Sequence, residues 1–279
     1  MRALEPEVFD AIWAEVEPIL PERIDDHPLG CHRPRVSDRI CLFVMLVRLV
    51  TGCSWVDAEA ITGYLVSDTT ARARRDEWVA AGVFDELAET MINAYDAAVG
   101  LAPAETLLDG SLHKAPCGGE GTGKNPVDRG KLGWKWSLAT DANGIPTGWV
   151  TAAANVNDSL LLAETLDTLD DQGLLEEIEV LHADRGYDNG VVRAHLQAIG
   201  INHFVVPRVR PRELKARSPV RVPLGKRWAV ERTNSWLSNY GQLRRNTDRR
   251  SAHRASQLAF VVAILLVVKL LDAGYLGRR

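Results

Sequence analysis

The sequence predicts an α/β protein in which an all-helical N-terminal region precedes a mixed sheet flanked by helices. Two observations carry this prediction. Up to about residue 100, apolar residues recur every three or four positions. From about Glu105 onward, short apolar runs and an alternating stretch indicate strands, with helical stretches between the later ones. The chain has 279 residues, enough for two domains, which we expect at 1–100 and 101–279.

Four helices are expected within the N-terminal region, joined by a loop and short turns. Gly52 ends a strongly apolar helix, because glycine adopts the left-handed backbone that closes a helix. Ser54 can cap the helix that follows, and Ser67 or Asp68 can cap the next one. The expected helices cover residues 6–20, 36–51, 55–62 and 69–81, with a loop over 21–34.

The second region is expected to contain five strands and four helices. Trp134, Trp136 and Leu138 alternate with other residues and define one face of a strand. Residues 141–144 form an Asn-Gly type of hairpin turn. Asp158 or Ser159 can cap the first helix. The expected strands cover 107–114, 133–140, 145–153, 178–183 and 203–207, and the helices cover 160–169, 191–199, 228–243 and 252–271.

The charge distribution is uneven, although the net charge is only −4 and the pI is about 6.0. Residues 1–30 carry eight acidic and two basic side chains, and residues 164–184 carry eight acids and no Lys or Arg. Residues 207–254 carry fourteen Lys or Arg against three acids, a net charge of +11. A solvated face would explain any charge cluster, but a local basic surface of this size favours nucleic-acid binding.

The cysteines and the apolar runs exclude several classes of protein. The four cysteines show no C-x-x-C spacing, so neither a zinc ribbon nor a disulfide framework is expected, and a reducing cytoplasm fits. The N-terminus is acidic and lacks an apolar segment, so no signal peptide is expected. The longest apolar run, residues 258–268, is too short to span a bilayer and predicts a buried helix.

Three carboxylates stand where divalent-metal chemistry would need them. Asp109 and Asp184 each end an apolar run, and Glu231 lies in a basic, aromatic-rich helical stretch. If they converge, they form a cage of hard oxygen ligands, and two metal ions in such a cage can catalyse phosphodiester cleavage. Taken singly, Asp109 could be a turn residue, Asp184 a strand cap, and Arg227 with Glu231 an ordinary i,i+4 surface pair.

Short strings around these carboxylates resemble the DDE transposases of bacterial insertion sequences, in the group around the insertion-sequence-five elements. They are Asp-Gly-Ser from Asp109, Asp-Arg-Gly-Tyr-Asp from Asp184, and Val-Glu-Arg-Thr around Glu231, in that order and 75 and 47 positions apart. Arg227 lies four positions before the glutamate. The chain departs from related families at Leu224 and Ser238, where a tyrosine and a lysine often stand.

The resemblance implies a function, a fold and partners. It implies an RNase H-like sheet after a helix-turn-helix-like domain, and a transposase that cuts the ends of a mobile DNA element and joins them to target DNA. The carboxylates Asp109, Asp184 and Glu231 would hold Mg²⁺ or Mn²⁺, with two ions expected. A homodimer or larger assembly on double-stranded DNA and a cytoplasmic location are also implied. The alternatives are a transposase-derived DNA-binding protein that no longer cuts, and a nuclease without strand transfer.

Eleven residues are expected to contact DNA. Helix, short turn and helix around residues 55–81 resemble a helix-turn-helix reader, although a plain helical bundle with a charged face would look the same. Tyr187 and Arg227 resemble residues that brace the DNA end, although Arg227 could instead only orient Glu231. The expected DNA-contacting residues are Arg72, Arg74, Arg75, Lys124, Lys131, Arg185, Tyr187, Arg227, Arg232, Arg244 and Arg245.

For the glycine-rich segment and for four tryptophans, we prefer a structural interpretation to a ligand-binding one. Residues 118–125 nearly match a phosphate-cradling loop, but Asn125 replaces the hydroxyl that magnesium needs, so we expect a mobile basic loop and no nucleotide cofactor. Four tryptophans could stack on unpaired bases, but tryptophans at strand or helix spacing are usually core residues. They are Trp134, Trp136, Trp228 and Trp236.

Overall fold

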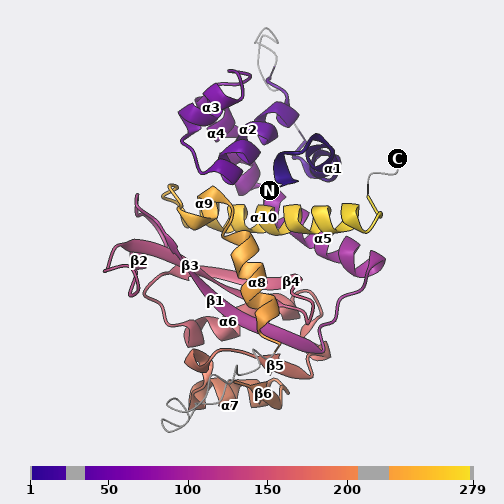
Figure 1. Cartoon of the computed structure of the whole chain (residues 1–279), viewed down its shortest axis with the longest axis vertical. Helices are drawn as coiled ribbons and strands as arrows, with labels where there is room; N and C mark the ends of the chain where they lie inside the picture. Colours follow the sequence, from indigo (N-terminus) through magenta and orange to yellow (C-terminus); the bar gives the residue numbers. More distant parts are fainter. Residues whose placement is uncertain (1, 23–34, 207–225, 277–279) are drawn as a thin grey trace, which may run out of the picture. The chain divides into compact units, whose positions relative to one another are not determined.

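The computed structural model describes residues 2–22, 35–206 and 226–276 (Figure 1). The chain forms two compact units. The first, which we call the helical unit, comprises Met1–Gly100, Lys114–Glu120 and Leu237–Arg279; the second, the sheet unit, comprises Leu101–His113 and Gly121–Trp236. The residues from Leu237 onward therefore group with the N-terminal hundred, whereas the sequence analysis assigned them to the second domain. The division into functional domains stays a prediction.

Local chemistry sets the boundaries of the first helices. Ser54 forms a reciprocal capping box with Asp57, and the Ser67 hydroxyl accepts a hydrogen bond from the backbone N–H of Thr70. Gly52 ends its helix with a φ of 76°. The helical unit contains α1 (Pro6–Val16), α2 (Asp38–Thr51), α3 (Trp55–Ile61), α4 (Asp68–Ala80), α5 (Val83–Ala98), α9 (Gly241–Arg244) and α10 (Ser251–Asp272), with 3-10 turns at Arg2–Leu4 and Glu17–Ile19.

Helix α10 is the core helix of the helical unit. Its apolar residues are buried almost without exception from Leu258 to Val267, and Phe260 packs on Phe84 of α5 with ring centroids 5.0 Å apart. By length and composition α10 could cross a membrane, as could α2 and α3 taken as one bent pair; the part of the chain described here holds no other such helix. The burial confirms the predicted core helix.

The sheet unit is built on one mixed sheet. Its strands are β1 (Glu105–Lys114), β2 (Gly123–Lys124), β3 (Leu132–Thr140), β4 (Pro146–Ala153), β5 (Val180–His182) and β6 (His203–Val205). The strand order is β2-β3-β1-β5-β6, and β4 also pairs with β3. The β3–β4 hairpin is antiparallel, whereas β1–β5 and β5–β6 are parallel. A hairpin followed by β-α-β units confirms the mixed, RNase H-like sheet that the resemblance implied.

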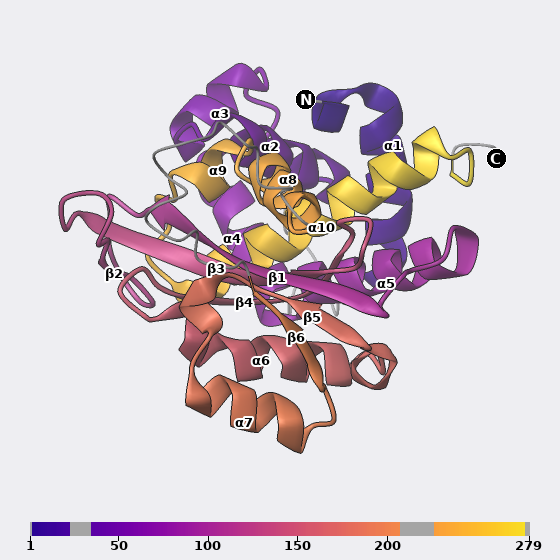
Figure 2. The same ribbon diagram turned by 60° about the horizontal axis from the view of Figure 1, so that its bottom comes forward.

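Helices cover both faces of this sheet. α6 (Asp158–Asp170) and α7 (Gly190–Ala198) lie against one face, and α8 (Trp228–Leu237) lies against the other (Figure 2). Strand β3 is therefore buried on both sides. Trp136 donates its indole N–H to Asn234 of α8, while Ser137, the next residue, accepts a hydrogen bond from Thr165 of α6. The alternating tryptophans are core residues at 0% exposure.

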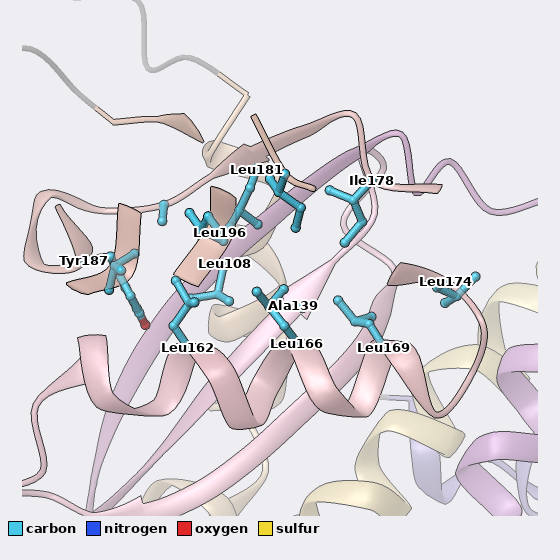
Figure 3. Close-up of a cluster of buried hydrophobic side chains, with 13 residues drawn as sticks. Leu108, Ala139, Leu162, Leu166, Leu169, Leu174, Ile178, Leu181, Tyr187 and Leu196 are labelled. Atoms are coloured by element: carbon cyan, nitrogen blue, oxygen red, sulfur yellow. The ribbon is translucent and has the colours of Figure 1, made fainter. Parts of the chain in front are cut away.

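A hydrophobic cluster joins the sheet to α6 and α7 (Figure 3). Leu108 of β1 and Leu181 of β5 meet a row of leucines on α6, including Leu162 and Leu166. Burial of each such side chain stabilises the fold by roughly 1.5–3 kcal/mol. The cluster fixes the neighbouring strands β1 and β5; Asp109 lies within β1, and Asp184 lies two positions after the end of β5.

Two details of the sequence prediction are corrected. The expected helix over 228–243 is two helices, α8 and α9, because Tyr240 has an extended backbone with a ψ of 125°. The cap of α6 is Asn157, whose side chain accepts a hydrogen bond from the backbone N–H of Ser159, and neither Asp158 nor Ser159 is the cap. Helix α5 was expected only as part of the helical region. The predicted loop beyond residue 22 and Pro207 lie outside the described residues.

Candidate active site

Asp109 and Asp184 are brought together by the parallel pairing of β1 with β5. Leu107 faces His182 in the register of these strands. Asp109 and Asp184 each lie two positions further along their chains, so continuing the same register places them opposite one another. Asp184 also caps a 3-10 turn, since its Oδ1 accepts the backbone N–H of Arg185 at 2.7 Å. Residues 75 positions apart thus meet at one point of the sheet.

Helix α8 and the residue before it carry three polar side chains on one side. Arg227 immediately precedes the helix, and Glu231 and Asn234 follow at helical spacing of four and three positions. The Asn234 side chain donates to Asp109 Oδ2 at 3.0 Å and accepts the Trp136 indole N–H at 2.8 Å. Asn234 therefore orients Asp109 and is itself held by a buried tryptophan.

The guanidinium of Arg227 contacts all three carboxylates. Its Nη2 lies 3.2 Å from Asp109 Oδ1 and 3.3 Å from Glu231 Oε1. Its Nη1 lies 3.2 Å from Asp184 Oδ1. Arg227 thus does more than orient Glu231 in an i,i+4 pair: it bridges the three acids around one cation.

The carboxylates differ in their exposure to water. The Asp109 side chain is 18% exposed, whereas those of Asp184 and Glu231 are 54% and 47% exposed. Burial raises the pKa of Asp109 to about 6, despite the opposing effects of the Arg227 charge and of the hydrogen bond from Asn234. A carboxyl group with such a pKa is costly to ionise unless further positive charge reaches it.

Gly110, the residue after Asp109, lies close to a further carboxylate, that of Asp158. A Cβ atom at Gly110 would stand 2.7 Å from Asp158 Oδ1, so a larger residue would displace Asp158. Lys135, which is 4% exposed, donates to Asp158 Oδ1 at 2.5 Å and to the carbonyl oxygen of Val156 at 2.8 Å. This pair neutralises Asp158 and leaves the charge of the site to the three converging acids.

The chemistry of the three acids suits a divalent metal ion, because carboxylate oxygens are the ligands that Mg²⁺ and Mn²⁺ prefer. In the described ranges no three acidic, histidine or cysteine side chains stand as a ready metal-binding group. The acids instead face the Arg227 guanidinium. The donor set fits a divalent ion, whereas the arrangement is that of a guanidinium-bridged cluster.

The structure buries three of the residues expected to contact DNA. Tyr187 is 1% exposed and belongs to the hydrophobic cluster (Figure 3). Arg74 is 4% exposed and forms ion pairs with Asp38 and Glu77. Arg75 is 9% exposed and bound to Asp248 at 2.8 Å. These placements argue against DNA contact by the three residues, because all three side chains are buried inside the protein.

Of the other residues expected to contact DNA, Arg232 is bound within the protein and six are exposed to solvent. Arg232 donates to the carbonyl oxygen of Asn143 at 2.6 Å and lies between the rings of Trp228 and Trp236, so it holds the hairpin turn against α8. Exposed side chains belong to Arg72, Lys124, Lys131, Arg185, Arg244 and Arg245. Six of the fourteen cations in residues 207–254 lie outside the described residues.

The glycine-rich segment is partly fixed. The backbone N–H of Glu120 donates to the carbonyl oxygen of Arg249 at 2.8 Å, and the Glu120 carboxylate accepts the backbone N–H of Ser251 at 3.2 Å. Gly119 has a φ of 104°, and a Cβ atom there would collide with Arg249. The expectation of a mobile loop is therefore corrected for these residues, while Lys124 is exposed in the short strand β2.

Sequence analysis missed Asn234. A signal was available, because Arg227, Glu231 and Asn234 follow the i, i+4, i+7 spacing of one helix face. Nothing in the sequence alone distinguishes an amide that orients a carboxylate from one that faces water.

Family models match both parts of the chain. Residues 102–268 match the transposase DDE domain, and residues 8–88 match a putative transposase domain of the IS4/5 family. The first match covers more than half of the chain and includes all three converging acids. The chain belongs to the DDE transposase family, whose members generally use divalent metal ions.

Two curated relatives come from insertion element IS402 of Burkholderia cepacia. A putative transposase for IS402 is 38% identical over 136 residues, which are 47% of this chain and 61% of the relative. An uncharacterized 16.2 kDa protein of the same element is 33% identical over 122 residues, which are 44% of this chain and 82% of the relative. The chain thus spans about three fifths of the putative transposase.

Among solved structures, a pre-cleavage Mos1 transpososome aligns with 88% of this chain and 82% of its own, at 10% identity and a TM-score of 0.28. A similarity this low carries no argument about the fold or the site.

Proposed function

We propose that this protein is a transposase that cuts the ends of a mobile DNA element and joins them to target DNA. The observation that carries the proposal is the convergence of Asp109, Asp184 and Glu231 on Arg227, in an RNase H-like sheet of a DDE transposase family member. With all three acids ionised, the cluster has a net charge of −2. It is therefore built to receive more positive charge than Arg227 supplies.

The proposed metal ligands are Asp109, Asp184 and Glu231, with Mg²⁺ or Mn²⁺ as the ion and two ions as the expected number. Bound there, the ions would supply an activated attacking oxygen and stabilise the leaving oxygen on phosphorus. Asn234 keeps Asp109 in one orientation through its hydrogen bond at 3.0 Å. Arg227 would exchange its carboxylate partners for phosphate oxygens and so position the DNA end.

Arg227 has a further donor suited to this role. Its Nε is buried and has no acceptor within the part of the chain that the structure describes. An anionic oxygen near the guanidinium would satisfy that donor, and a guanidinium matches the paired oxygens of a phosphate. Positioning and charge neutralisation are the main contributions that proteins make to phosphoryl transfer.

The proposed partners follow from the same function. Double-stranded DNA would be both substrate and target, and two ends must meet, so a homodimer or larger assembly on DNA is proposed. Residues 1–100 are proposed to recognise the element's ends. Of the three arginines expected on α4 to contact DNA, Arg72 is the one whose side chain is exposed, and a DNA contact by it is proposed. Further DNA contacts are proposed at Lys124, Lys131, Arg185, Arg244 and Arg245, and the working location is the cytoplasm.

The test is incubation of the protein with labelled DNA of the element's own ends and Mg²⁺ or Mn²⁺, with EDTA as the control. Nicked and joined products together support a transposase. Nicks without joined products indicate a nuclease that lacks strand transfer. Binding of the ends with neither product would leave the alternative, a DNA-binding protein that no longer cuts.

A further inference from the structure

A hollow of about 470 Å³ lies in the helical unit, and none of the three carboxylates described above lines it. Helices α2, α3 and α4 line one side, and the segment that leads into α10 lines the other. We call it the arginine hollow, because its lining includes five arginines around one tryptophan: Arg48, Arg72, Arg75, Arg249, Arg250 and Trp55. Its volume is in the range of ligand sites.

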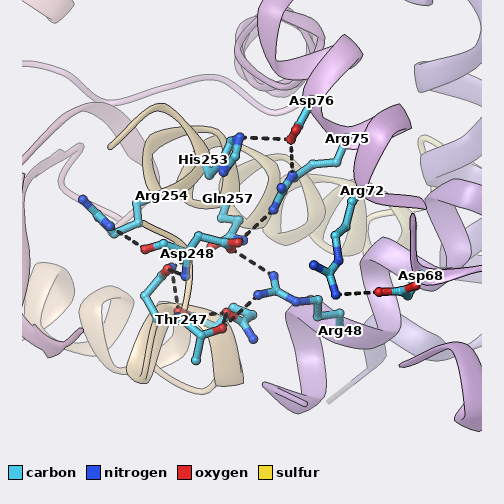
Figure 4. A network of polar contacts seen from close by, with 12 residues as sticks. Arg48, Asp68, Arg72, Arg75, Asp76, Thr247, Asp248, His253, Arg254 and Gln257 are labelled. Atoms are coloured by element: carbon cyan, nitrogen blue, oxygen red, sulfur yellow. Dashed lines mark hydrogen bonds and ion pairs between the residues drawn. The ribbon is translucent and has the colours of Figure 1, made fainter. Parts of the chain in front are cut away.

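The floor of the arginine hollow is rigid. Arg48 and Arg75 both bind the Asp248 carboxylate, at 3.0 and 2.8 Å (Figure 4). Their guanidinium groups also lie 4.5 and 5.0 Å from the Trp55 ring centroid. Asp76 lies 2.8 Å from Arg75 Nε and 3.1 Å from His253 Nε2. Two arginines face two aspartates here, so the floor carries no net charge when His253 is neutral.

The rim carries the surplus positive charge. Arg249 and Arg250 are exposed. The Arg72 side chain is 46% exposed and pairs with Asp68 at 2.5 Å in an i,i+4 contact (Figure 4). An i,i+4 ion pair near the surface contributes little to stability, so Arg72 can exchange Asp68 for a stronger anion. Since the lining holds five arginines and two aspartates, its net charge is +3.

The backbone of Arg249 is held in place, and Arg250 lies between it and Ser251, whose backbone N–H is also hydrogen-bonded. Glu120 donates its backbone N–H to the carbonyl oxygen of Arg249, and only glycine at position 119 allows this approach. The Glu120 carboxylate accepts from the backbone N–H and the hydroxyl of Ser251, so its charge is engaged at the start of α10. The backbone that carries Arg249 and Arg250 is therefore held in place, while both residues are exposed to solvent.

We propose that the arginine hollow binds a phosphodiester of the DNA backbone, with Arg72, Arg249 and Arg250 as the phosphate contacts. This inference rests on the proposed function, because it names a part of the DNA track. It also gives Arg72 a different role from a helix-turn-helix reader: the side chain contacts phosphate and carries no sequence information. Charge complementarity selects the occupant: Arg249 and Arg250 are surplus cations, Arg72 is a third cation that is paired only with Asp68, and a polyanion matches such a rim beside a neutral floor.

The test is binding of a labelled random-sequence duplex, measured by fluorescence anisotropy over a range of salt concentrations. Each neutralised phosphate contributes about 0.9 to the slope of log affinity against log salt. The double variant Arg249→Ala/Arg250→Ala should lower that slope by about 1–2 and weaken binding about 10-fold at moderate salt. The control Arg2→Ala/Arg39→Ala removes two arginines of the same unit, with side chains 41% and 45% exposed, and should change neither quantity.

Arg72→Ala should lower the slope equally for random DNA and for the element's own ends. A loss of preference for the ends with an unchanged slope on random DNA would overturn the proposal, because Arg72 would then read bases. An equal effect of the control pair would overturn it as well. If the alanine double variant melts early, Arg249→Gln/Arg250→Gln replaces it, and unchanged binding by that folded variant contradicts the proposal.

Inorganic phosphate distinguishes a small-anion site from a DNA site. If millimolar phosphate raises the melting midpoint of the wild-type protein through Arg249 and Arg250 while DNA binding ignores them, the occupant is a free anion and the proposal fails. Failure of the proposed function looks different, because DNA would then bind with the full salt slope and remain uncut.

Discussion

Two networks of charged side chains, one in each unit, use the same residue types in opposite proportions. In the sheet unit three carboxylates share the single guanidinium of Arg227. In the helical unit two guanidiniums, those of Arg48 and Arg75, share the single carboxylate of Asp248 (Figure 4). The network around Arg227 has more negative than positive groups, whereas the network around Asp248 has enough positive groups to balance its carboxylates.

The pKa values of Asp248 and Asp109 reflect this difference in the number of neighbouring arginines. Burial would raise the pKa of Asp248, but Arg48 and Arg75 together hold it below its ordinary value. Burial raises the pKa of Asp109 to about 6, because one shared guanidinium does not offset it. With Asp76 beside Arg75, the helical-unit network has two arginines and two aspartates, and removing one partner from such a network leaves an uncompensated charge. A network with a surplus of one sign can instead bind a partner of the opposite sign.

The largest effect on stability is expected for Asp248→Asn. The change leaves Arg48 and Arg75 with their shared carboxylate removed, and breaking a buried charge network of this kind costs about 3–5 kcal/mol. Urea unfolding measures the loss. The control Asp10→Asn removes an acid that pairs with Arg39 at the surface and is 61% exposed, so its effect should stay within about 1 kcal/mol. An equal loss of unfolding free energy in the two variants would show that Asp248 does not hold a buried charge network together.

Asp109→Asn is expected to act in the opposite direction and to stabilise the protein at pH 7. Burial raises the pKa of Asp109 from its ordinary value of 3.8 to about 6 in the fold. Its contribution to stability is therefore full below about pH 4 and is lost as the pH rises through 6. An amide removes this loss, a gain of about 1–3 kcal/mol at pH 7. Thermal midpoints at pH 4 and pH 7 measure it.

The gain from Asp109→Asn should disappear at pH 4, where the wild-type carboxyl is protonated in the fold. Destabilisation at pH 7 would show that the Arg227 contact outweighs the burial of Asp109. In that case the carboxylates of both networks, Asp109 and Asp248, would stabilise the fold through their arginine partners.

Arg227→Gln is expected to have the smallest effect on stability, a loss of about 1 kcal/mol, because two of its three partners are about half exposed. The three acids would then lack their shared cation. Millimolar Mg²⁺ should raise the thermal midpoint of this variant more than that of the wild-type protein. An equal rise in both proteins would mean that Arg227 and the metal do not compete for the same oxygens.

Local patterns predicted much of the fold and part of the site. Asp109 and Asp184 each follow an apolar run, and the parallel register of β1 and β5 brings the two positions together, although β1 continues beyond Asp109 to Lys114. Ser54 and Gly52 marked helix boundaries through their own backbone chemistry. These signals lie within a few residues of the feature that they predict.

The errors come from partners that are distant in sequence. Arg75 looked like a surface cation of α4, but its acid, Asp248, lies 173 positions away. Arg74 pairs with Asp38, and Tyr187 fills a core assembled from several elements. The central place of Arg227 likewise depends on β1, β5 and α8 meeting. No pattern in a single sequence reports such partners.

The central claim is that the three acids around Arg227 are the cutting site, and Glu231→Gln tests it most directly. The amide keeps the size of the side chain and loses its charge. The control is Glu176→Gln, an exposed glutamate of the same unit. On the element's own ends with Mg²⁺ or Mn²⁺, the account predicts at least a 10²–10³-fold loss of cutting for Glu231→Gln. DNA binding should be unchanged, and the control should cut normally. Normal cutting by Glu231→Gln would contradict the account and leave Glu231 as a surface helix residue.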